Sequence, residues 1–226
     1  MRRSPWILLS TILLPALVSC SGPTRPQSTN QNPTLPTNET PEGAVLRLIG
    51  LYETRDAVEY GKLFTGDFKF EFSNSADPDL VQKWALGWSR SDEIVAAQNL
   101  FQGGANSHGI YQPAALSIEL QLLPTTPSDD NTSGRDPDLY KALLAAVDAR
   151  IDVPGDITYV VGQAPPQSNR FFLVRGDAAV GLGPDQPADA NRWYVWNWRD
   201  ESPVLKGLVP TQNESSTWGR VKDLYR

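Results

Sequence analysis

The chain has 226 residues and a net charge of −6, so it lacks the excess of Lys and Arg that attracts nucleic acid, and we expect no nucleic-acid partner. It contains a single cysteine, Cys20, and a single histidine, His108. Zinc sites, thiol nucleophiles and Ser-His-Asp triads need more of these side chains, which excludes most hydrolase chemistry. We predict no metal site and no cofactor.

The first 20 residues have the pattern of an export signal. A basic start is followed by an apolar run from Trp6 to Val18, which spans about a dozen residues and is too short for a transmembrane helix. The segment 17–20, Leu-Val-Ser-Cys, resembles the lipobox of bacterial lipoprotein precursors. This resemblance implies cleavage of residues 1–19, lipidation of Cys20 and attachment to the lipid bilayer. Ser21 after the cysteine implies the outer membrane of the cell envelope.

A polar segment separates this signal from the rest of the chain. Residues 20–40 comprise the lipidated cysteine and a stretch rich in Pro, Thr, Ser, Asn and Gln, with Leu35 as its one large apolar residue. Such a composition buries too little surface to fold, which predicts a disordered tether. Residues 41–226 are sufficient for one hydrophobic core and contain no second linker. We therefore predict a single domain over this range.

Helical spacing of apolar residues predicts three helices near the start of this domain and one at its end. The first follows Thr40-Pro41, a typical helix start. In the last, Trp218, Val221 and Tyr225 form one stripe, so the helix is expected to dock on the domain. The predicted ranges are 42–53, 57–64, a helix from the Ser89–Asp92 capping box to Gly103, and a tail helix from Ser216.

Strict alternation in residues 67–72 predicts a strand with Phe68, Phe70 and Phe72 on the core face. Residues 139–153 are ambiguous: their leucines and alanines favour a helix, whereas the second half alternates, and we favour a strand there. We interpret Asp148, Arg150 and Asp152 as a solvated charged face. Further strands are predicted over 116–122, 171–175 and 192–200.

Helices followed by antiparallel strands indicate an α+β fold. The run from Ala44 to Phe68 resembles the opening of nuclear transport factor 2-like domains, including the SnoaL-like polyketide cyclases, and Arg192–Trp198 is similar to their last strand. The tail Thr217–Arg226 also resembles a group of uncharacterised bacterial lipoproteins. The resemblance implies N-terminal helices packed on a strongly curved antiparallel sheet, in the cone-shaped, cystatin-like arrangement. Domains of this family often dimerise through the sheet, which suggests a homodimer.

The interior of such a cone binds a ligand, carries acid–base catalysis or is filled by side chains. Tyr194, Trp196 and Trp198 alternate along the last long strand and are expected on one face, where they either line a pocket or pack in the core. His108 lies in a predicted loop, and no residue is assigned a catalytic role. The candidate pocket residues are Phe68, Phe70, Trp88, Tyr194, Trp196 and Trp198.

These features favour a membrane-anchored envelope lipoprotein whose cone binds a small apolar ligand or a protein partner. The alternative is a cofactor-free isomerase, dehydratase or cyclase with a buried Asp or Tyr as base. A third hypothesis is an adaptor whose cone is filled. An enzyme needs a desolvated carboxylate in its cavity, a binding protein needs an empty cavity, and an adaptor needs an exposed apolar patch.

Overall fold

The computed structural model describes residues 34–122, 126–127, 135–161, 168–178, 181–202 and 213–226. The predicted signal peptide, Cys20 and most of the predicted tether lie outside these ranges. The chain divides into two units, residues 1–34 and 35–226, and the second contains all the elements described below. None of the helices in the described ranges combines the length and the apolar character needed to cross a bilayer.

The described residues form five helices: α1 (Pro41–Thr54), α2 (Ala57–Gly61), α3 (Pro78–Lys83), α4 (Arg90–Gln102) and α5 (Trp218–Tyr225). The predicted start of α1 is confirmed, because the Thr40 side chain accepts a hydrogen bond from Gly43 N at 2.9 Å. The capping box of α4 is also confirmed, with Ser89 and Asp92 bonded to each other's backbone N–H. Local sequence signals therefore set the starts of the two longest helices.

The second helix is shorter than predicted. It ends at Gly61, and Phe64 begins strand β1 (Phe64–Glu71) instead of ending the helix. The backbone explains the change: Phe64 lies opposite Val195 of strand β10 (Trp193–Asp200), and Val195 N donates to Leu63 O at 2.8 Å. A distant strand thus takes over residues whose local pattern favoured a helix. Helix α3 was not predicted.

In the described part of the chain, the main sheet contains nine strands, with the path β11-β8-β7-β9-β10-β1-β2 and with β5 and β6 also paired to β7. A separate two-stranded sheet joins β3 and β4. The pairing is antiparallel except for β1 with β10 and β8 with β11, which are parallel. The remaining strands are β2 (Trp88–Ser89), β3 (Gly104–Ala105), β4 (Tyr111–Gln112), β5 (Ser117–Leu122), β6 (Thr126–Pro127), β7 (Tyr140–Val153), β8 (Ile157–Val161), β9 (Ser168–Arg175) and β11 (Asn213–Ser216).

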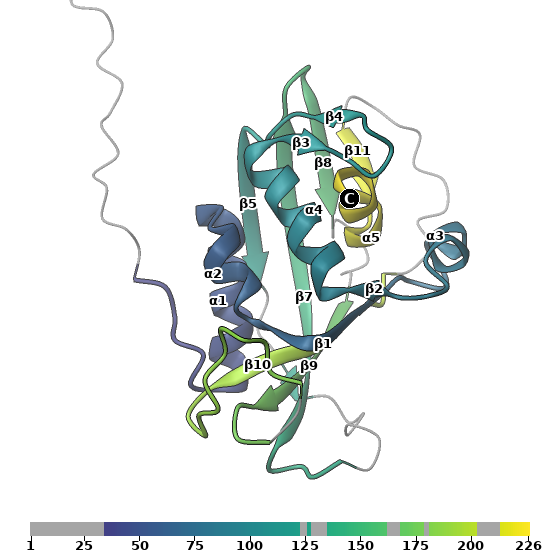
Figure 1. Ribbon diagram of the computed structural model, residues 1–226. Coiled ribbons are helices and arrows are strands. Elements are labelled where there is room, and N and C mark those ends of the chain that lie inside the picture. The colour runs from purple at the N-terminus through teal and green to yellow at the C-terminus, as the bar shows by residue number, and fades with distance from the viewer. Residues whose placement is uncertain (1–33, 123–125, 128–134, 162–167, 179–180, 203–212) are drawn as a thin grey trace, which may run out of the picture. The chain divides into compact units, whose positions relative to one another are not determined.

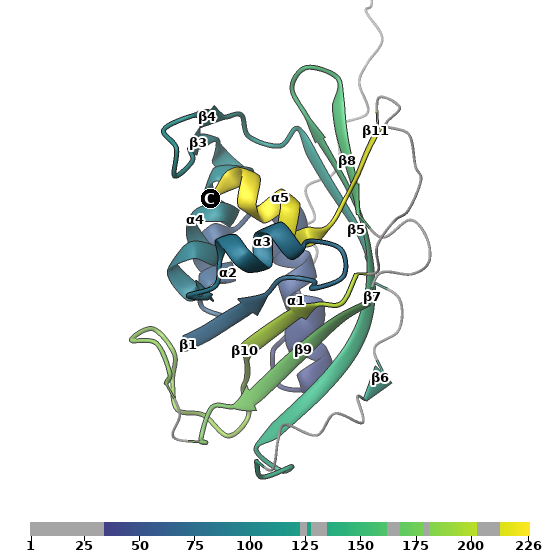
Figure 2. The same cartoon turned by 90° about the vertical axis from the view of Figure 1, so that its right-hand side faces the viewer.

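Strand β7 is the long central element of the sheet. It is extended throughout, so the ambiguous first half of 139–153 is also a strand. Residues 140–146 pair with β9, and residues 147–153 pair with β5 and β8. Pairing on both edges overrides the helix preference of the leucines and alanines. Figure 2 shows that β7 bends along its length.

Helices α1, α4 and α5 lie on the concave side of the curved sheet (Figures 1 and 2). Their aromatic side chains meet in one core, where the Tyr52 ring lies 5.1 Å from Phe101 and 5.4 Å from Trp218 between centroids. The predicted α+β class, with helices packed on a strongly curved sheet, is confirmed. The tail helix docks on the domain with its stripe of Trp218, Val221 and Tyr225 buried, as predicted.

Candidate functional site

An ion pair between α4 and α5 lies inside the core. Lys222 of α5 is 3% exposed and Glu93 of α4 is fully buried. The Lys222 ammonium donates to Glu93 Oε2 at 2.9 Å and lies 2.9 Å from Oε1. Buried charges are rare unless paired, so this pair is an unusual feature of the domain.

Two further side chains bind the same carboxylate. Trp88 Nε1 of β2 donates to Glu93 Oε2 at 3.0 Å, and the Tyr60 hydroxyl of α2 donates to Glu93 Oε1. Glu93 therefore accepts from three donors that come from three different elements. The carboxylate is held in place by groups outside α5 as well as by Lys222.

Aromatic rings surround the other side of the Lys222 ammonium. Its Nζ lies 3.4 Å from the centroid of Trp198 on β10 and 3.8 Å from that of Phe70 on β1. The negative face of an aromatic ring attracts a cation, most strongly where water is excluded. We call these six residues the buried centre: Tyr60, Phe70, Trp88, Glu93, Trp198 and Lys222.

Burial shifts the pKa values of several ionisable side chains in this region. Desolvation lowers the pKa of Lys222 to about 8, although the Glu93 carboxylate opposes the shift. Desolvation raises the pKa of Tyr60 and of the neighbouring Tyr52 well above their ordinary value, and the charge of Glu93 adds to both shifts. The tyrosines therefore remain protonated at neutral pH, whereas Lys222 titrates close to it.

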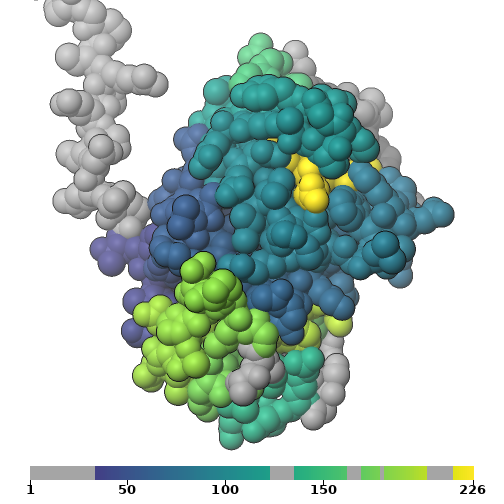
Figure 3. Space-filling model, viewed as in Figure 1, coloured from purple at the N-terminus to yellow at the C-terminus, as the bar shows by residue number. Residues whose placement is uncertain are grey.

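Polar contacts at both ends hold α5 in place. Its first turn has Thr217 as N-cap, accepting from Arg220 N at 3.1 Å. Figure 3 shows the yellow C-terminal segment at the surface between segments coloured teal and blue. The remaining contacts join the Thr217 hydroxyl to Asp77, Gly219 N to Asp200 at 3.2 Å, Lys83 to Asp223 at 2.7 Å and Arg226 to Asp92 at 2.6 Å.

Four of the six predicted pocket residues lie in the main core. Phe68, Phe70, Trp88 and Trp198 are each at most 2% exposed. Three of them belong to the buried centre, and the Phe68 ring packs against that of Phe64 in a tilted arrangement, with 4.4 Å between centroids. Three aromatic candidates are thus packed in the buried centre, while neither of its charged members was among the candidates.

The other two predicted pocket residues, Tyr194 and Trp196, lie in a separate cluster with Tyr140 and Val174. The expectation that Tyr194, Trp196 and Trp198 share one face is therefore wrong. The register of β10 shifts between Val195 and Asn197, and an extra residue in a strand reverses the alternation beyond it. Trp198 consequently faces the main core.

Both missed residues carry a signal in the sequence. Glu93 is four residues before Ala97 and seven before Leu100, so it lies on the apolar stripe of α4. Lys222 is four residues after Trp218 and lies on the stripe of α5. One charge on each apolar stripe, with opposite signs, indicates a buried pair if the two helices pack together.

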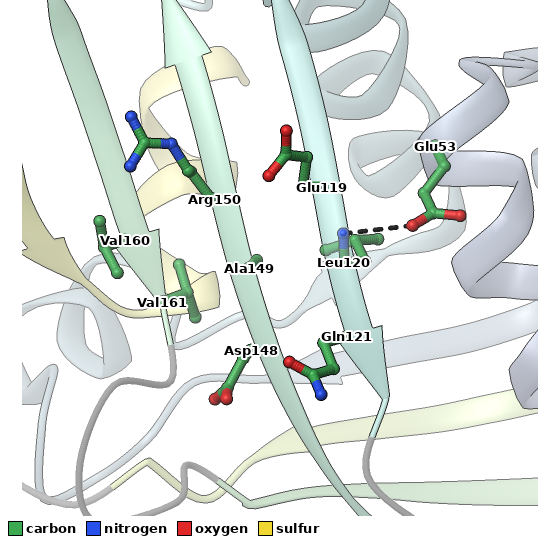
Figure 4. A pocket seen from close by; sticks show the side chains of 9 residues that line it. All are labelled: Glu53, Glu119, Leu120, Gln121, Asp148, Ala149, Arg150, Val160 and Val161. Atoms are coloured by element: carbon green, nitrogen blue, oxygen red, sulfur yellow. Dashed lines mark hydrogen bonds between the residues drawn. The ribbon is translucent and has the colours of Figure 1, made fainter.

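A second candidate is a hollow of about 310 Å³ beside β5 and β7. Figure 4 shows its charged side chains, with Glu53 of α1 accepting from Leu120 N at 3.3 Å. Arg150 is exposed and pairs with Asp152 at 3.2 Å, which confirms the predicted solvated charged face. The hollow is lined by Glu53, Glu119, Leu120, Gln121, Asp148, Ala149, Arg150, Val160 and Val161.

The remaining candidates contribute no chemistry. His108 is exposed in a turn, as predicted. Within the described residues, no group of three or more His, Cys, Asp or Glu is placed to hold a metal ion. Among the described residues, the buried centre is therefore the strongest candidate site, because it combines a desolvated carboxylate, a desolvated amine and aromatic walls.

No protein-family model matches the sequence, and no curated protein is significantly similar to it. Three solved structures from Novosphingobium aromaticivorans have a similar fold. One, provisionally named an aromatic ring hydroxylase, has a TM-score of 0.47 and 12% identity, covering 75% of this chain and 90% of that one. Another, provisionally named a scytalone dehydratase, has a TM-score of 0.44 and 6% identity over 74% and 92%.

The third is described as an ntf2-like protein with a cystatin-like fold, with a TM-score of 0.38 and 14% identity over 73% of this chain and 79% of that one. The chain is thus similar in structure to proteins of the kind that its sequence resembles. At these TM-scores the similarity carries no argument about activity, and the function must be argued from the chain's own residues.

Proposed function

We propose that residues 41–226 form a ligand-binding domain of the bacterial cell envelope, anchored in the outer membrane by a lipid on Cys20. The binding site is the buried centre, which Lys222 of α5 occupies in this structure, the closed form; in the open form α5 is withdrawn. One observation carries this proposal: Glu93, Phe70 and Trp198, all outside α5, contact a single ammonium group that α5 supplies. Tyr60 and Trp88 hold the Glu93 carboxylate in place.

The composition of the buried centre favours binding over a purely structural role. Apolar side chains of similar volume generally stabilise a core at least as well as a buried ion pair does. A desolvated Lys222 and Glu93 are therefore a poor choice for packing alone. They are well suited to an interior that recognises a polar group on a largely apolar ligand, because aromatic walls and one carboxylate give both area and orientation.

The acid–base enzyme receives less support. Burial raises the pKa of Tyr52 and Tyr60, the reverse of what a tyrosine base needs near neutral pH. Burial also raises the pKa of Asp200, but its carboxylate accepts from Ser202 and from Gly219 N. Tyr60 and Asp200 are thus already engaged in hydrogen bonds that support the fold.

Native mass spectrometry of residues 21–226, purified without the lipid, tests the binding function. We expect a fraction of the protein to carry a small molecule that gentle activation removes. A protein that carries no ligand after purification, and that binds none when small apolar molecules are added, would contradict the proposal and favour the filled adaptor. The same spectra give the oligomeric mass and test the predicted homodimer through the sheet.

Membrane fractionation tests the anchor separately. The full chain should sediment with the envelope, and a Cys20→Ala variant should remain unprocessed or appear in the soluble fraction without lipid. Labelling with a radioactive fatty acid should mark the wild type only. Incorporation of the fatty acid into Cys20→Ala would overturn the lipoprotein assignment and leave the binding function untouched.

A further inference from the structure

Five of the six residues of the buried centre come from elements other than α5. Tyr60, Phe70, Trp88, Glu93 and Trp198 come from α2, β1, β2, α4 and β10, and none belongs to α5. We call these five residues the receptor group. Lys222 alone comes from α5, the last helix of the chain. Withdrawal of α5 would thus remove the cation and leave the receptor group on elements that are held by other contacts.

The receptor group has the chemistry that recognises an ammonium ion. An ammonium group combines a positive charge with N–H donors, and here it meets both oxygens of Glu93 at 2.9 Å and two ring faces within 3.8 Å. Aromatic cages of this kind bind alkylammonium and quaternary ammonium ligands. Tyr60 and Trp88 orient the carboxylate without blocking the rings. The four-carbon stem of Lys222 shows that a primary alkylammonium fits.

Helix α5 fits this site imperfectly, which makes competition feasible. Trp218 is 1% exposed, yet its indole Nε1 has no hydrogen-bond partner among the described residues. The helix packs closely at Gly219, where an added Cβ would lie 2.7 Å from the Phe72 ring, so a larger side chain at this position would weaken docking further. The buried N–H and the desolvated Lys222 both oppose docking. Within the described residues α5 takes no part in the strand pairing, so its withdrawal breaks no ladder of the sheet.

We propose that the ligand of this domain carries a primary alkylammonium group, which displaces Lys222 from the receptor group and releases α5. This inference rests on the proposed binding function and narrows its ligand class. The ammonium group belongs either to a free alkylamine or to a lysine side chain of a peptide. A ligand of this class binds the form in which α5 is undocked more tightly than the form in which α5 is docked. The size of this difference in affinity sets how far the ligand shifts the population toward the undocked form.

A Lys222→Ala variant removes the competing ammonium, so ligand binding to the receptor group can be measured without displacement of Lys222. We expect n-butylammonium to bind this variant about tenfold or more tightly than n-butanol, measured by calorimetry and by the change in tryptophan fluorescence. A Lys69→Ala variant is the matched control, since Lys69 precedes Phe70 on β1 but is exposed. Equal binding of the alcohol and the amine, or no binding of either, overturns the ammonium specificity.

Hydrogen exchange on the wild type tests release without relying on that variant. Amides of residues 218–226 should exchange faster with n-butylammonium or with a lysine-containing peptide, and the stronger of the two effects identifies the source of the amine. A Gly219→Ala variant should respond at lower amine concentration, because the added methyl group weakens docking. Unchanged exchange at amine concentrations that saturate Lys222→Ala overturns the proposal.

A neutral probe separates this inference from the function on which it rests. If n-butylbenzene accelerates exchange in α5 and the amines do not, the domain binds ligands in the buried centre but the ammonium class is wrong. If neither probe affects α5 and native mass spectrometry detects no ligand, the binding function itself fails. If the amines alone accelerate exchange, both the function and the ligand class are supported.

Discussion

Two ion pairs in this domain have similar geometry and opposite settings. Lys222 and Glu93 meet at 2.9 Å inside the core, whereas Arg150 and Asp152 meet at 3.2 Å on the open face of β7. The Lys222 and Glu93 side chains are 2% and 0% exposed, and the Arg150 and Asp152 side chains are 52% and 30% exposed. The distance between the charges is thus a poor guide to what each pair contributes.

Solvent decides the difference. Water and salt screen the exposed pair, and each partner can return to water at little cost. The buried pair has lost its hydration, so each charge depends on the other and on its neutral hydrogen-bond partners. A single substitution in the core should therefore have a large effect, and a single substitution on the open face should have almost none.

The largest expected effect is that of Lys222→Met, which keeps the volume and removes the charge. Glu93 would remain buried beside Tyr60 and Trp88 without a counter-ion, and we expect a loss of about 3–5 kcal/mol in the free energy of unfolding. Urea denaturation at neutral pH measures it. Glu93→Gln, which leaves the lysine unpaired, should cost a similar amount.

The double variant Lys222→Met/Glu93→Gln is the control for this prediction. It removes both charges, so we expect it to be within about 1–2 kcal/mol of the wild type. Losses in the two single variants that simply add in the double variant would show that the charges do not depend on each other. In that case the buried pair would be no different in kind from the exposed one.

The two regions also differ in how well the sequence predicts them. The strict alternation of β5 and the charged face of Asp148, Arg150 and Asp152 could be predicted. A strand with one solvent-exposed face alternates polar and apolar residues, and this pattern is visible in the sequence. The N-terminal capping residues of α1 and α4 could be predicted equally well. Each of these features depends on neighbours within a few residues along the chain.

The buried centre could be predicted only in part. Its aromatic walls were identifiable as large apolar residues, but the pairing of Glu93 with Lys222 joins positions 129 residues apart. The shift in β10 is likewise invisible, because a bulge is set by the neighbouring strands β1 and β9 rather than by the sequence around Trp196. Tertiary contacts decided both features.

The protonation of Lys222 gives the next largest effect. Its pKa is about 8 in the folded state against 10.5 for the free side chain, so at intermediate pH the unfolded chain holds more protons. Stability therefore rises with pH, by about 2 kcal/mol between pH 8 and pH 10. The neutral amine is easier to bury than the ammonium and can still donate an N–H to Glu93, which methionine at this position cannot do. Above that range the buried tyrosines oppose the trend, since their raised pKa makes the unfolded state release its protons first.

Denaturation series from pH 7 to pH 10 measure this slope, with the double variant as the reference. Glu93 and Asp200 are the carboxylates that interact with Lys222, and Asp200 is unchanged in the double variant. The difference between the two proteins should therefore report Lys222. An identical slope in both would mean that Lys222 is solvated in the folded state, and the contrast with the exposed pair would disappear.

A smaller effect is expected at the start of α5. Thr217→Ala removes the N-cap bond to Arg220 N and the hydroxyl contact with Asp77, which should cost about 1–2 kcal/mol. Exchange of the α5 amides should increase more than exchange of α4, since the cap holds only the terminal helix. Uniform acceleration across the domain would show instead that α5 unfolds together with the core and cannot be released separately.

The smallest effect is predicted for the exposed pair. Arg150→Ala should change the free energy of unfolding by less than about 0.5 kcal/mol, because the guanidinium returns to water and the Asp152 carboxylate keeps other partners. The pKa of Asp152 is lowered chiefly by the Thr158 and Ser117 hydroxyls, with Arg150 contributing less. Urea denaturation of Arg150→Ala and Lys222→Met under the same conditions compares the two losses in the free energy of unfolding. A loss comparable to that in Lys222→Met would mean that the open face of β7 is covered in the native protein, and that its charges belong to an interface.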